Sequence, residues 1–549
     1  MFQQLRLDIL KRLEKYDYII VEEPKRADSD LAIPLFNVSK KEQIPINEVS
    51  KEITSLLEDH PLISKLEFDR GFLNIYFNRE LFSKEVLSNI KDEKYGTLNS
   101  NGKVVCIDYS SPNIAKSFSV GHLRSTVIGA SLYKVYEKLG YKVIGINHLG
   151  DWGTQFGKMI VAYDLWGSEE ELKKNPIDYL QSLYVKFHEE ENELLEEKAR
   201  ETFKALEDGD KRVLALWEYF KEESLKEFMK MYEILNVKFD SYHGEAFYND
   251  KMADVVKILT EKELTEIDDG ALIVRLNDDL PPALIKRSDG ATLYITRDLA
   301  ALLYRYNTYH FDKVLYVVGN EQKLHFNQLK KVSDLMGYNF DITHVNFGLV
   351  LIDGKKMSTR EGKVVKLYDV ISEAVNLALK AITEKNPNLK DKEEAARKIG
   401  VSAVIFNDLK NDRKLDIDFN LEEMLSFEGL TGPYLQYSSV RIYSMLKDET
   451  IKEGLVDPTL FKDDLYYKLV ILLSQFSNTL ERVILENGPH ILSRYLLNLA
   501  ATFNQFYGAH KVIVEDEKVK NTNLILIKAV RVVLNEGMRL LGMAHLDEM

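Results

Sequence analysis

Apolar residues recur three or four positions apart over long parts of this chain, and that spacing predicts helices. Near the start it runs from Leu5 to Leu13 and from Val49 to Leu57, mixed with strand-like runs such as LEFDRGFLNIYFN at 66–78. A polar, turn-rich break follows at residues 99–102. These patterns predict a small α+β domain over residues 1–100.

Helical spacing also dominates the last third of the chain, from about residue 367 onward. Between 524 and 541 the apolar positions on this spacing are Leu526, Val530, Val533, Leu534, Leu540 and Leu541. We therefore expect a separate all-α domain, a helical bundle, over residues 367–549.

The middle of the chain begins with a β-α-β pattern. VVCID (104–108) is a short apolar strand, a helix then runs from Gly121 or His122 to Gly140, and YKVIGIN (141–147) is the next strand. Strands separated by a helix of this length are typical of a parallel, doubly wound sheet.

The same pattern returns after a long interval, with KVLYVVGN (313–320), a helix ending near Gly337, and THVNFGLVL (343–351). Charged helix-forming residues fill 165–285 between the two halves. We therefore predict a Rossmann-like α/β domain over 101–366 that carries a helical insertion.

Composition narrows the class of protein. The chain has 549 residues, of which 45 % are hydrophobic, so it is long enough for several folded domains. No apolar run approaches the roughly 18 residues that a membrane span requires, and the charged N-terminal stretch has no apolar signal core. Cys106 is the single cysteine, which excludes a disulfide framework and a cysteine-based zinc site. We expect a cytoplasmic protein without a membrane partner.

The net charge of −14 at first argues against a nucleic-acid partner, because phosphate binding needs a basic surface. Its distribution weakens that objection. Residues 187–230 hold 14 acidic and 8 basic side chains, whereas 431–549 are nearly neutral. We expect the acidic insertion to be turned away from a basic face that runs from the 110–126 loop to the helical domain.

Two loops of the predicted sheet combine glycine with cations, and ligands of an open parallel sheet bind beyond the carboxyl ends of its strands. The loop over 110–122 offers Lys116, His122 and a helix N-terminus beginning at Gly121. The loop over 353–363 places cations and hydroxyls between two glycines, as a phosphate clamp requires. The alternative for both is a solvated surface loop, with His122 capping its helix.

The two loops resemble the signature motifs of class I aminoacyl-tRNA synthetases, in the form SSPNIAKSFSVGHLRST (110–126) and KMSTREG (356–362). Four further blocks are similar to arginyl-tRNA synthetases, namely NHLGDWGTQFG (147–157), TLYITRDLA (292–300), GNEQKLHFNQ (319–328) and TGPYLQYSSVR (431–441). The N-terminal DSDLAIPLF (28–36) and GFLNIYFN (71–78) and the C-terminal stretch 529–549 resemble that family's tRNA-contacting and anticodon-binding domains.

The resemblance implies activation of L-arginine with ATP to arginyl-adenylate and pyrophosphate, followed by transfer to the terminal ribose of tRNA(Arg). It implies Mg²⁺ as a helper, no zinc, a monomer, and activation only when tRNA is present. The residues implied for catalysis are Lys116, His122, Lys356 and Arg360. Those implied for ATP are Ser119, Gly121, His122, His325, Met357 and Ser358, with packing or helix capping as the alternative for His325 and Met357.

Specificity for arginine calls for anions, because the substrate side chain is a planar, permanent cation. Asp298 and Tyr294, four apart, share one face if their segment is helical, and both match positions that hold the guanidinium in the family. Asp108 is a candidate second anion, or else it caps the following loop. By resemblance, Asn113 and Gln322 hold the backbone groups of the amino acid. Tyr434 and Gln436 resemble tRNA-facing positions, with core packing as the alternative for Tyr434.

The chain departs from the family pattern twice. Ser119 stands where the first signature usually has histidine, and Thr359 stands where the second commonly has lysine. By resemblance, Lys116 then supplies the missing cation. The alternatives are a stand-alone nucleotidyltransferase, which needs neither end domain, and a catalytically silent tRNA-binding relative. Arginine-dependent ATP–pyrophosphate exchange separates the three.

Overall fold

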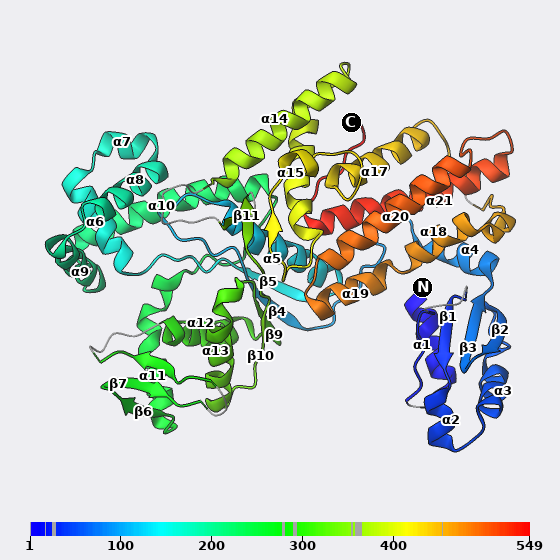
Figure 1. Ribbon diagram of the computed structural model, residues 1–549, viewed down its shortest axis with the longest axis horizontal. Helices are drawn as coiled ribbons and strands as arrows, with labels where there is room; N and C mark the ends of the chain where they lie inside the picture. Colours follow the sequence, from blue (N-terminus) through cyan, green and yellow to red (C-terminus); the bar gives the residue numbers. More distant parts are fainter. Residues whose placement is uncertain are drawn as a thin grey trace.

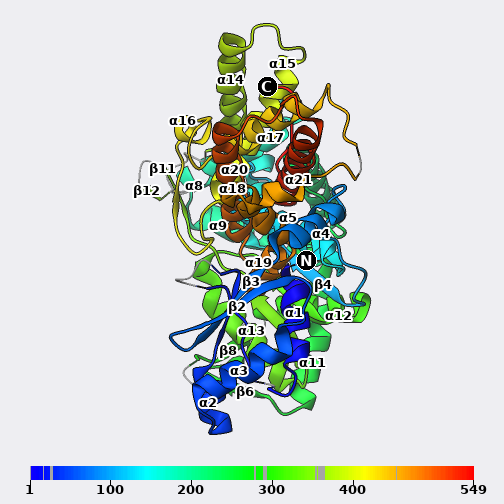
Figure 2. The same cartoon turned by 90° about the vertical axis from the view of Figure 1, so that its right-hand side faces the viewer.

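The computed structural model describes residues 2–16, 18–24, 29–276, 280–288, 294–352, 355–356, 365–452 and 454–549. A parallel sheet lies at the centre, with helices of the insertion at one end of the long axis and the C-terminal helices at the other (Figure 1). The N-terminal domain projects from the C-terminal helices, and a second view at right angles shows it below them as well (Figure 2).

The N-terminal domain is the expected α+β unit. Its three-stranded antiparallel sheet has the order β1-β3-β2. The strands are β1 (Leu31–Pro34), β2 (Ile63–Asp69) and β3 (Phe72–Phe77), and the helices are α1 (Phe2–Arg12), α2 (Phe36–Glu42) and α3 (Ile46–Leu57). The run at 66–78 is therefore a hairpin, which turns at Arg70 and Gly71, both with positive φ. The next helix, α4 (Arg79–Asn89), already packs on the C-terminal helices.

The central sheet confirms the doubly wound prediction. Its four strands are all parallel, in the order β10-β9-β4-β5. They are β4 (Val104–Asp108), β5 (Lys142–Ile146), β9 (Lys313–Tyr316) and β10 (Asp341–His344), and the helices between them include α5 (Val120–Lys138) and α13 (Lys323–Leu335). Helix α5 ends where the sequence predicts, because Gly140 takes a positive φ just after its last turn.

The prediction of one strand over 343–351 is wrong. β10 ends at His344, and the chain then leaves the central sheet to form β11 (Val350–Ile352) in a second sheet of order β12-β11-β13. There β11 pairs with β12 (Lys355–Lys356) and, in parallel, with β13 (Ile417–Asp418). Arg413, which is distant in the sequence, holds the chain where it changes direction, because its guanidinium donates to the backbone and the side chain of Asn346.

The insertion is helical only in its first part. Its helices continue from α6 (Thr154–Trp166) through α7 (Glu169–Lys174), α8 (Pro176–Glu189), α9 (Glu193–Glu207) and α10 (Lys211–Ile234). After η1 (Glu245–Lys251) and α11 (Met252–Glu261) the chain forms an antiparallel sheet of β6 (Thr265–Asp268), β7 (Ala271–Val274) and β8 (Ala283–Lys286). Asp269 and Gly270 turn the first hairpin with positive φ, which is the Asp-Gly signal of a two-residue hairpin loop.

The C-terminal part is helical, as expected, apart from the short strand β13, which pairs with β11 of the second sheet. Its helices are α14 (Leu367–Lys385), α15 (Lys392–Leu409), α16 (Leu421–Met424), α17 (Gly432–Leu446), η4 (Pro458–Lys462), α18 (Asp464–Ser474), α19 (Phe476–Glu486), α20 (His490–Ala509) and α21 (Glu517–Leu541). A buried ion pair of 2.8 Å between Lys138 and Glu536 fastens α21 to α5 of the central domain. Among the described residues, no helix is long and apolar enough to cross a membrane.

Candidate active site

The loop that joins β4 to α5 has a strained backbone. Ser110, Ser111 and Ala115 all take positive φ, a conformation that L-residues other than glycine rarely adopt. The backbone N–H of Ala115 donates to the hydroxyl of Ser224 on α10 at 2.7 Å, and the Ser110 hydroxyl contacts that of Tyr232 at 2.9 Å. Strain of this kind persists only where the surroundings fix it, and it collects at functional sites.

The insertion packs directly against this loop, because α10 supplies Ser224 and Tyr232 to it. On α8, Gln181 accepts a hydrogen bond from the Ser117 hydroxyl at 2.9 Å. The reason lies in the amphipathic character of α10, whose buried face is made of apolar residues and Ser224.

His122 is held as a neutral imidazole. Its Nδ1 atom accepts the backbone N–H of Ser119 at 3.0 Å, and the Ser119 hydroxyl lies 3.1 Å from the same nitrogen. Because a backbone N–H only donates, Nδ1 carries no proton and Nε2 carries it. Burial, together with the charge of Lys116, lowers the pKa of His122 to about 4. At neutral pH its Nε2–H is thus an uncharged hydrogen-bond donor.

Lys116 is a partly buried cation in the same loop. Its Nζ lies 5.5 Å from the centre of the Tyr184 ring on α8, and burial lowers its pKa. In the described part of the chain no carboxylate pairs with it. A desolvated ammonium without a counter-ion is suited to receive an anion such as a phosphate.

The second loop is anchored to the first on its far side. Val120 N–H donates to the carbonyl of Val365 at 3.1 Å, and Leu367 N–H donates to that of Phe118 at 3.0 Å. Lys366 pairs with Asp178 of α8 at 2.5 Å. Met357, Ser358, Thr359 and Arg360 lie outside the described residues, and for Lys356 only the backbone, in β12, is described.

Asp298 lies on α12 (Tyr294–Tyr309), so the helix on which its relation to Tyr294 depends is confirmed. The Nε2 atom of His325, on α13, lies 2.5 Å from Oδ2 of Asp298, and Nε2 of His148 lies 3.9 Å from Oδ1. Burial alone would raise the pKa of Asp298, but the hydrogen bond with His325 and the nearby cations hold it below its ordinary value. Asp298 is therefore ionised, while Tyr294, one turn earlier, is 67 % exposed.

Glu245 is a second carboxylate that sequence reasoning missed. It begins η1 and pairs with Arg297, the neighbour of Asp298, at 3.1 Å. Burial raises its pKa to about 7, Arg297 opposes the rise, and the negative charge of Asp298 adds to it. Glu245 is thus a buried carboxylate that is paired with one guanidinium of the protein and influenced by the charge of Asp298.

Asp108 is bound to other residues of the protein and is not placed as a free ligand for arginine. Its Oδ2 lies 2.7 Å from Nη2 of Arg305, a side chain that is 1 % exposed, and its Oδ1 accepts the Ser111 hydroxyl at 2.9 Å. Both oxygens therefore have partners inside the protein. This geometry favours the alternative, in which Asp108 holds the following loop, and it also joins β4 to the helix of Asp298.

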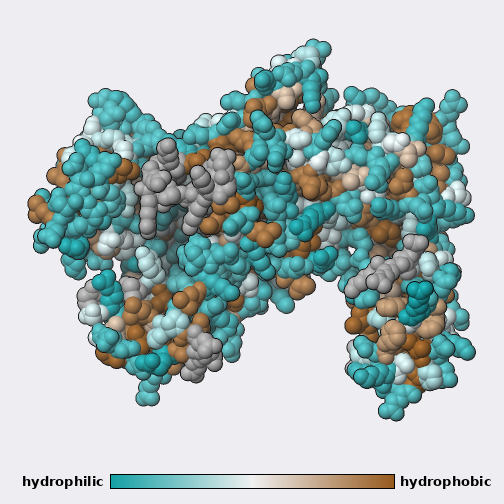
Figure 3. Space-filling model, in the orientation of Figure 1, coloured by the Kyte–Doolittle hydropathy of each residue, from teal (hydrophilic) through white to brown (hydrophobic). Residues whose placement is uncertain are grey.

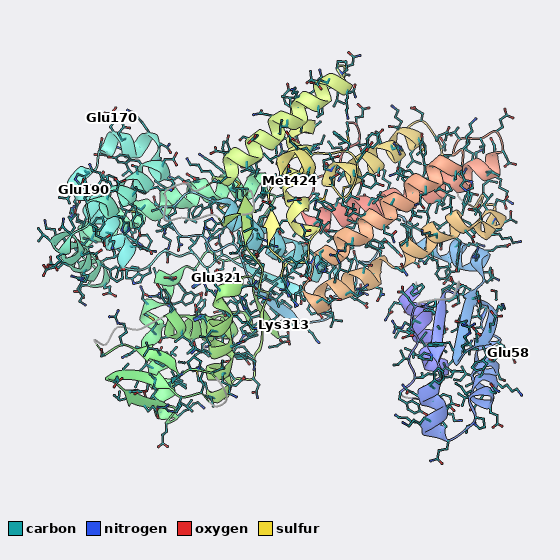
Figure 4. The ribbon with its side chains drawn as sticks, viewed as in Figure 1. Glu58, Glu170, Glu190, Lys313, Glu321 and Met424 are labelled. Atoms are coloured by element: carbon teal, nitrogen blue, oxygen red, sulfur yellow. The ribbon has the colours of Figure 1, made fainter. Side chains whose placement is uncertain are left out.

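Two of the remaining candidates, Asn113 and Gln322, lie at the surface. Asn113 and Gln322 are exposed beyond β4 and β9, which are neighbouring parallel strands, so both lie at one edge of the sheet. In Figure 4, Glu321, next to Gln322, lies closer to the insertion helices than Lys313 does at the start of β9. The carboxyl edge of the sheet therefore faces the insertion.

The two residues expected to face tRNA differ in exposure. Gln436 is 0 % exposed, and its amide donates to the carbonyl of Ala544 at 2.7 Å, so its side chain belongs to the interior of the bundle. Tyr434 is partly buried, and its hydroxyl accepts from Asn504 at 2.9 Å. Sequence reasoning missed their neighbour Arg441, which lies 4.8 Å and 5.0 Å from the rings of Tyr437 and Tyr507.

Three family models match the chain. They are tRNA synthetases class I (R), catalytic domain, over residues 84–421; DALR anticodon binding domain, over 435–549; and Arginyl tRNA synthetase N terminal domain, over 3–77. With the parallel sheet and its two loops, they define the chain as a class I aminoacyl-tRNA synthetase.

Relatives place it more narrowly. An arginine–tRNA ligase of Exiguobacterium sibiricum is 49 % identical over 541 residues, covering 96 % of this chain and 95 % of that protein. One of Ligilactobacillus salivarius is 49 % identical over 551 residues, covering 99 % and 96 %. The solved arginyl-tRNA synthetase of Thermus thermophilus is 25 % identical with a TM-score of 0.89, and each chain is covered completely. The chain belongs to the arginyl-tRNA synthetase family.

Proposed function

We propose that this enzyme activates L-arginine with ATP and transfers the arginyl group to tRNA(Arg), using the two loops and the two carboxylates described above. The observation that carries the assignment of residues is the ionised Asp298, held by His325. Glu245 is paired with Arg297, the neighbour of Asp298, and we assign it as the second carboxylate of a site for a substrate side chain with a delocalised positive charge.

Arginine is selected by geometry as well as charge. Asp298 is ionised and held by His325, so it offers a fixed acceptor to two parallel N–H groups. Glu245 takes the other side of the guanidinium and gives up its proton as the substrate binds. We assign His325 to the orientation of Asp298 rather than to ATP, and Tyr294 to the open side of the pocket. Asn113 and Gln322 hold the amino and carboxylate groups of arginine.

Activation requires an in-line attack of the arginine carboxylate on the α-phosphate of ATP, with release of pyrophosphate. Such a step depends on positioning and on donors aimed at the developing charge. Nε2–H of His122 donates to a phosphate oxygen without changing protonation state. Lys116 supplies the positive charge that Thr359 does not, and Lys356 and Arg360 join it from the second loop. Ser119 caps α5 and fixes the tautomer of His122.

Mg²⁺ accompanies ATP in this proposal. The ion neutralises phosphate charge, and in such sites it is bound mainly by phosphates and water rather than by a protein cage. Among the described residues, no group of three or more histidine, cysteine or acidic side chains is placed to bind a metal ion.

The tRNA lies along the helical domain, which the anticodon-binding match covers. Tyr437 and Tyr507 are 41 % and 42 % exposed and flank Arg441 on neighbouring helices, a combination that stacks on unpaired bases. Figure 3 shows an open space between the N-terminal domain and the lobe around α11 to α13, wide enough to leave both surfaces accessible. We further propose a monomer located in the cytoplasm.

Arginine-dependent ATP–pyrophosphate exchange tests this function. We expect exchange with purified protein, ATP, Mg²⁺, arginine and tRNA(Arg) together, and none when tRNA is left out. Exchange without tRNA would contradict the tRNA requirement alone. Absence of exchange under both conditions would instead identify a silent tRNA-binding relative.

A further inference from the structure

Arg124 is a buried cation that the proposed reaction does not use. It lies near the start of α5, two residues after His122, and is 1 % exposed. Burying a guanidinium costs free energy unless every part of it is paired or hydrogen-bonded. Its partners therefore indicate why an arginine is kept at this position.

The guanidinium joins segments that are far apart in the sequence. Nε lies 3.1 Å from Oδ2 of Asp408 on α15, a carboxylate that is equally buried. Nη1 donates to the carbonyl oxygens of Gly348 and Leu415, each at 2.8 Å. Nη2 donates to the carbonyl of Arg413 at 3.3 Å. A planar fork of donors is what such a junction requires, and lysine does not have one.

One of the segments that Arg124 joins, at Gly348, leads through β11 into the second signature loop, and the other, at Leu415, leads into β13. Backbone bonds of 3.0 Å from Ile417 to Leu349 and 3.1 Å from Phe419 to Leu351 fasten them together as β11 and β13. The loop begins at residue 353, immediately after β11. On its far side, Val365 and the residues after it are fastened to the start of α5, as described above.

We propose that Arg124 is a positioning residue for adenylate formation, which sets the strand entering the second signature loop at a fixed place relative to His122. Both sides of that loop are then anchored to one helix, by Arg124 where the chain enters and by backbone bonds where it leaves. The proposal rests on the proposed function, since it requires both loops to act on the same ATP.

The same helix provides a matched control. Lys138, fourteen residues further along α5 and therefore about 21 Å away, pairs with Glu536 in an equally buried position, with side chains 3 % and 2 % exposed. Glu536 also pairs with Arg539 at 2.7 Å, so it keeps a partner when Lys138 is replaced. None of the described contacts of Lys138 reaches either signature loop.

The first experiment compares R124K with K138M in arginine-dependent ATP–pyrophosphate exchange with tRNA, alongside thermal unfolding. Both variants should lower Tm. Only R124K should lower kcat, by about 100-fold, because a small misplacement of reacting groups is enough for such a loss. The KM for arginine should not change, since Asp298 and Glu245 lie elsewhere. An unchanged kcat in R124K, or losses of kcat that follow Tm equally in both variants, would overturn the proposal.

A second pair of variants separates positioning from stability and carries the test if R124K does not fold. R124M leaves Asp408 buried without a counter-ion, whereas R124M/D408L removes both charges, so Tm should recover in the double variant. The kcat should stay low, because methionine cannot donate to the carbonyls of Gly348 and Leu415. Recovery of kcat together with Tm would show a purely structural role. Wild-type protein without exchange would instead overturn the proposed function itself.

Discussion

The Nε2 atom of His325 lies 2.5 Å from Oδ2 of Asp298. This contact joins α13 to α12 and fixes the carboxylate before any substrate is present. His148, from the segment after β5, approaches the other oxygen. Asp298 is therefore preorganised as an anion, and the predictions below follow from what surrounds it.

Replacing Asp298 with alanine should raise the KM for arginine by about 100-fold or abolish activation, because hydrogen bonds to a charged group contribute about 1.5–3 kcal/mol each. Tm should change little. D334A is the control, since the partner of Asp334 among the described residues is Lys330, one turn earlier on α13. The assay is exchange at varied arginine concentration, and an unchanged KM in D298A would contradict the assignment.

Arginine binding should strengthen as pH rises through the pKa of Glu245, about 7. Below that value the buried carboxyl is mostly protonated, and the guanidinium binds its ionised form. The KM for arginine should therefore fall between about pH 6 and pH 8. E245Q should have a higher KM that no longer depends on pH in this range. A slope that persists in E245Q would show that another group is responsible.

Lys116 should be required for activation rather than for arginine binding. K116M should lower kcat for exchange by about 100-fold, comparable to the loss of one transition-state donor, with little change in the KM for arginine. The second signature commonly has lysine where this chain has Thr359. If Lys116 supplies that charge instead, T359K should restore part of the activity of K116M. Full activity in K116M, or no gain from T359K, would count against this role.

The strained loop should depend on α10 for its shape. S224A leaves the N–H of Ala115 without a partner inside the protein, which should cost about 1–3 kcal/mol of stability and raise the KM for ATP. S182A, on the exposed face of α8, is the control and should behave as wild type. Chemical denaturation and exchange kinetics measure the two effects. Equal behaviour of S224A and S182A would contradict the support that we assign to α10.

Local patterns predicted much of the central domain. The strand VVCID and the helix after it have the expected bounds because burial, period and a terminal glycine agree there. The hairpin at Asp269 and Gly270 had a readable signal in its turn residues, but charged helix-forming residues on both sides outweighed it. No local signal predicted that residues 343–351 divide between β10 and β11, because the chain is held there by Arg413, which is distant in the sequence.

Sequence could predict the site residues that lie within motifs. It could not predict the contacts between residues that only the fold brings together. Asp298 and His122 were found, but their protonation depends on His325 and Ser119 through geometry. Nothing in the local sequence distinguishes Glu245 from the other glutamates, because its place in the site depends on its pairing with Arg297, beside Asp298. Arg124 lies within a motif, yet only its contacts with distant carbonyls distinguish it from a solvated arginine.

The central claim is that this arginine–tRNA ligase selects its amino acid with Asp298 and Glu245. The most direct measurement is kcat/KM for charging tRNA(Arg) with arginine and with lysine, in wild type and in D298A. The wild type should prefer arginine by about 10⁴-fold or more, because lysine leaves buried polar groups unpaired, and D298A should lose most of that preference. A wild type that charges lysine as well as arginine, or a D298A variant with full discrimination, would contradict it.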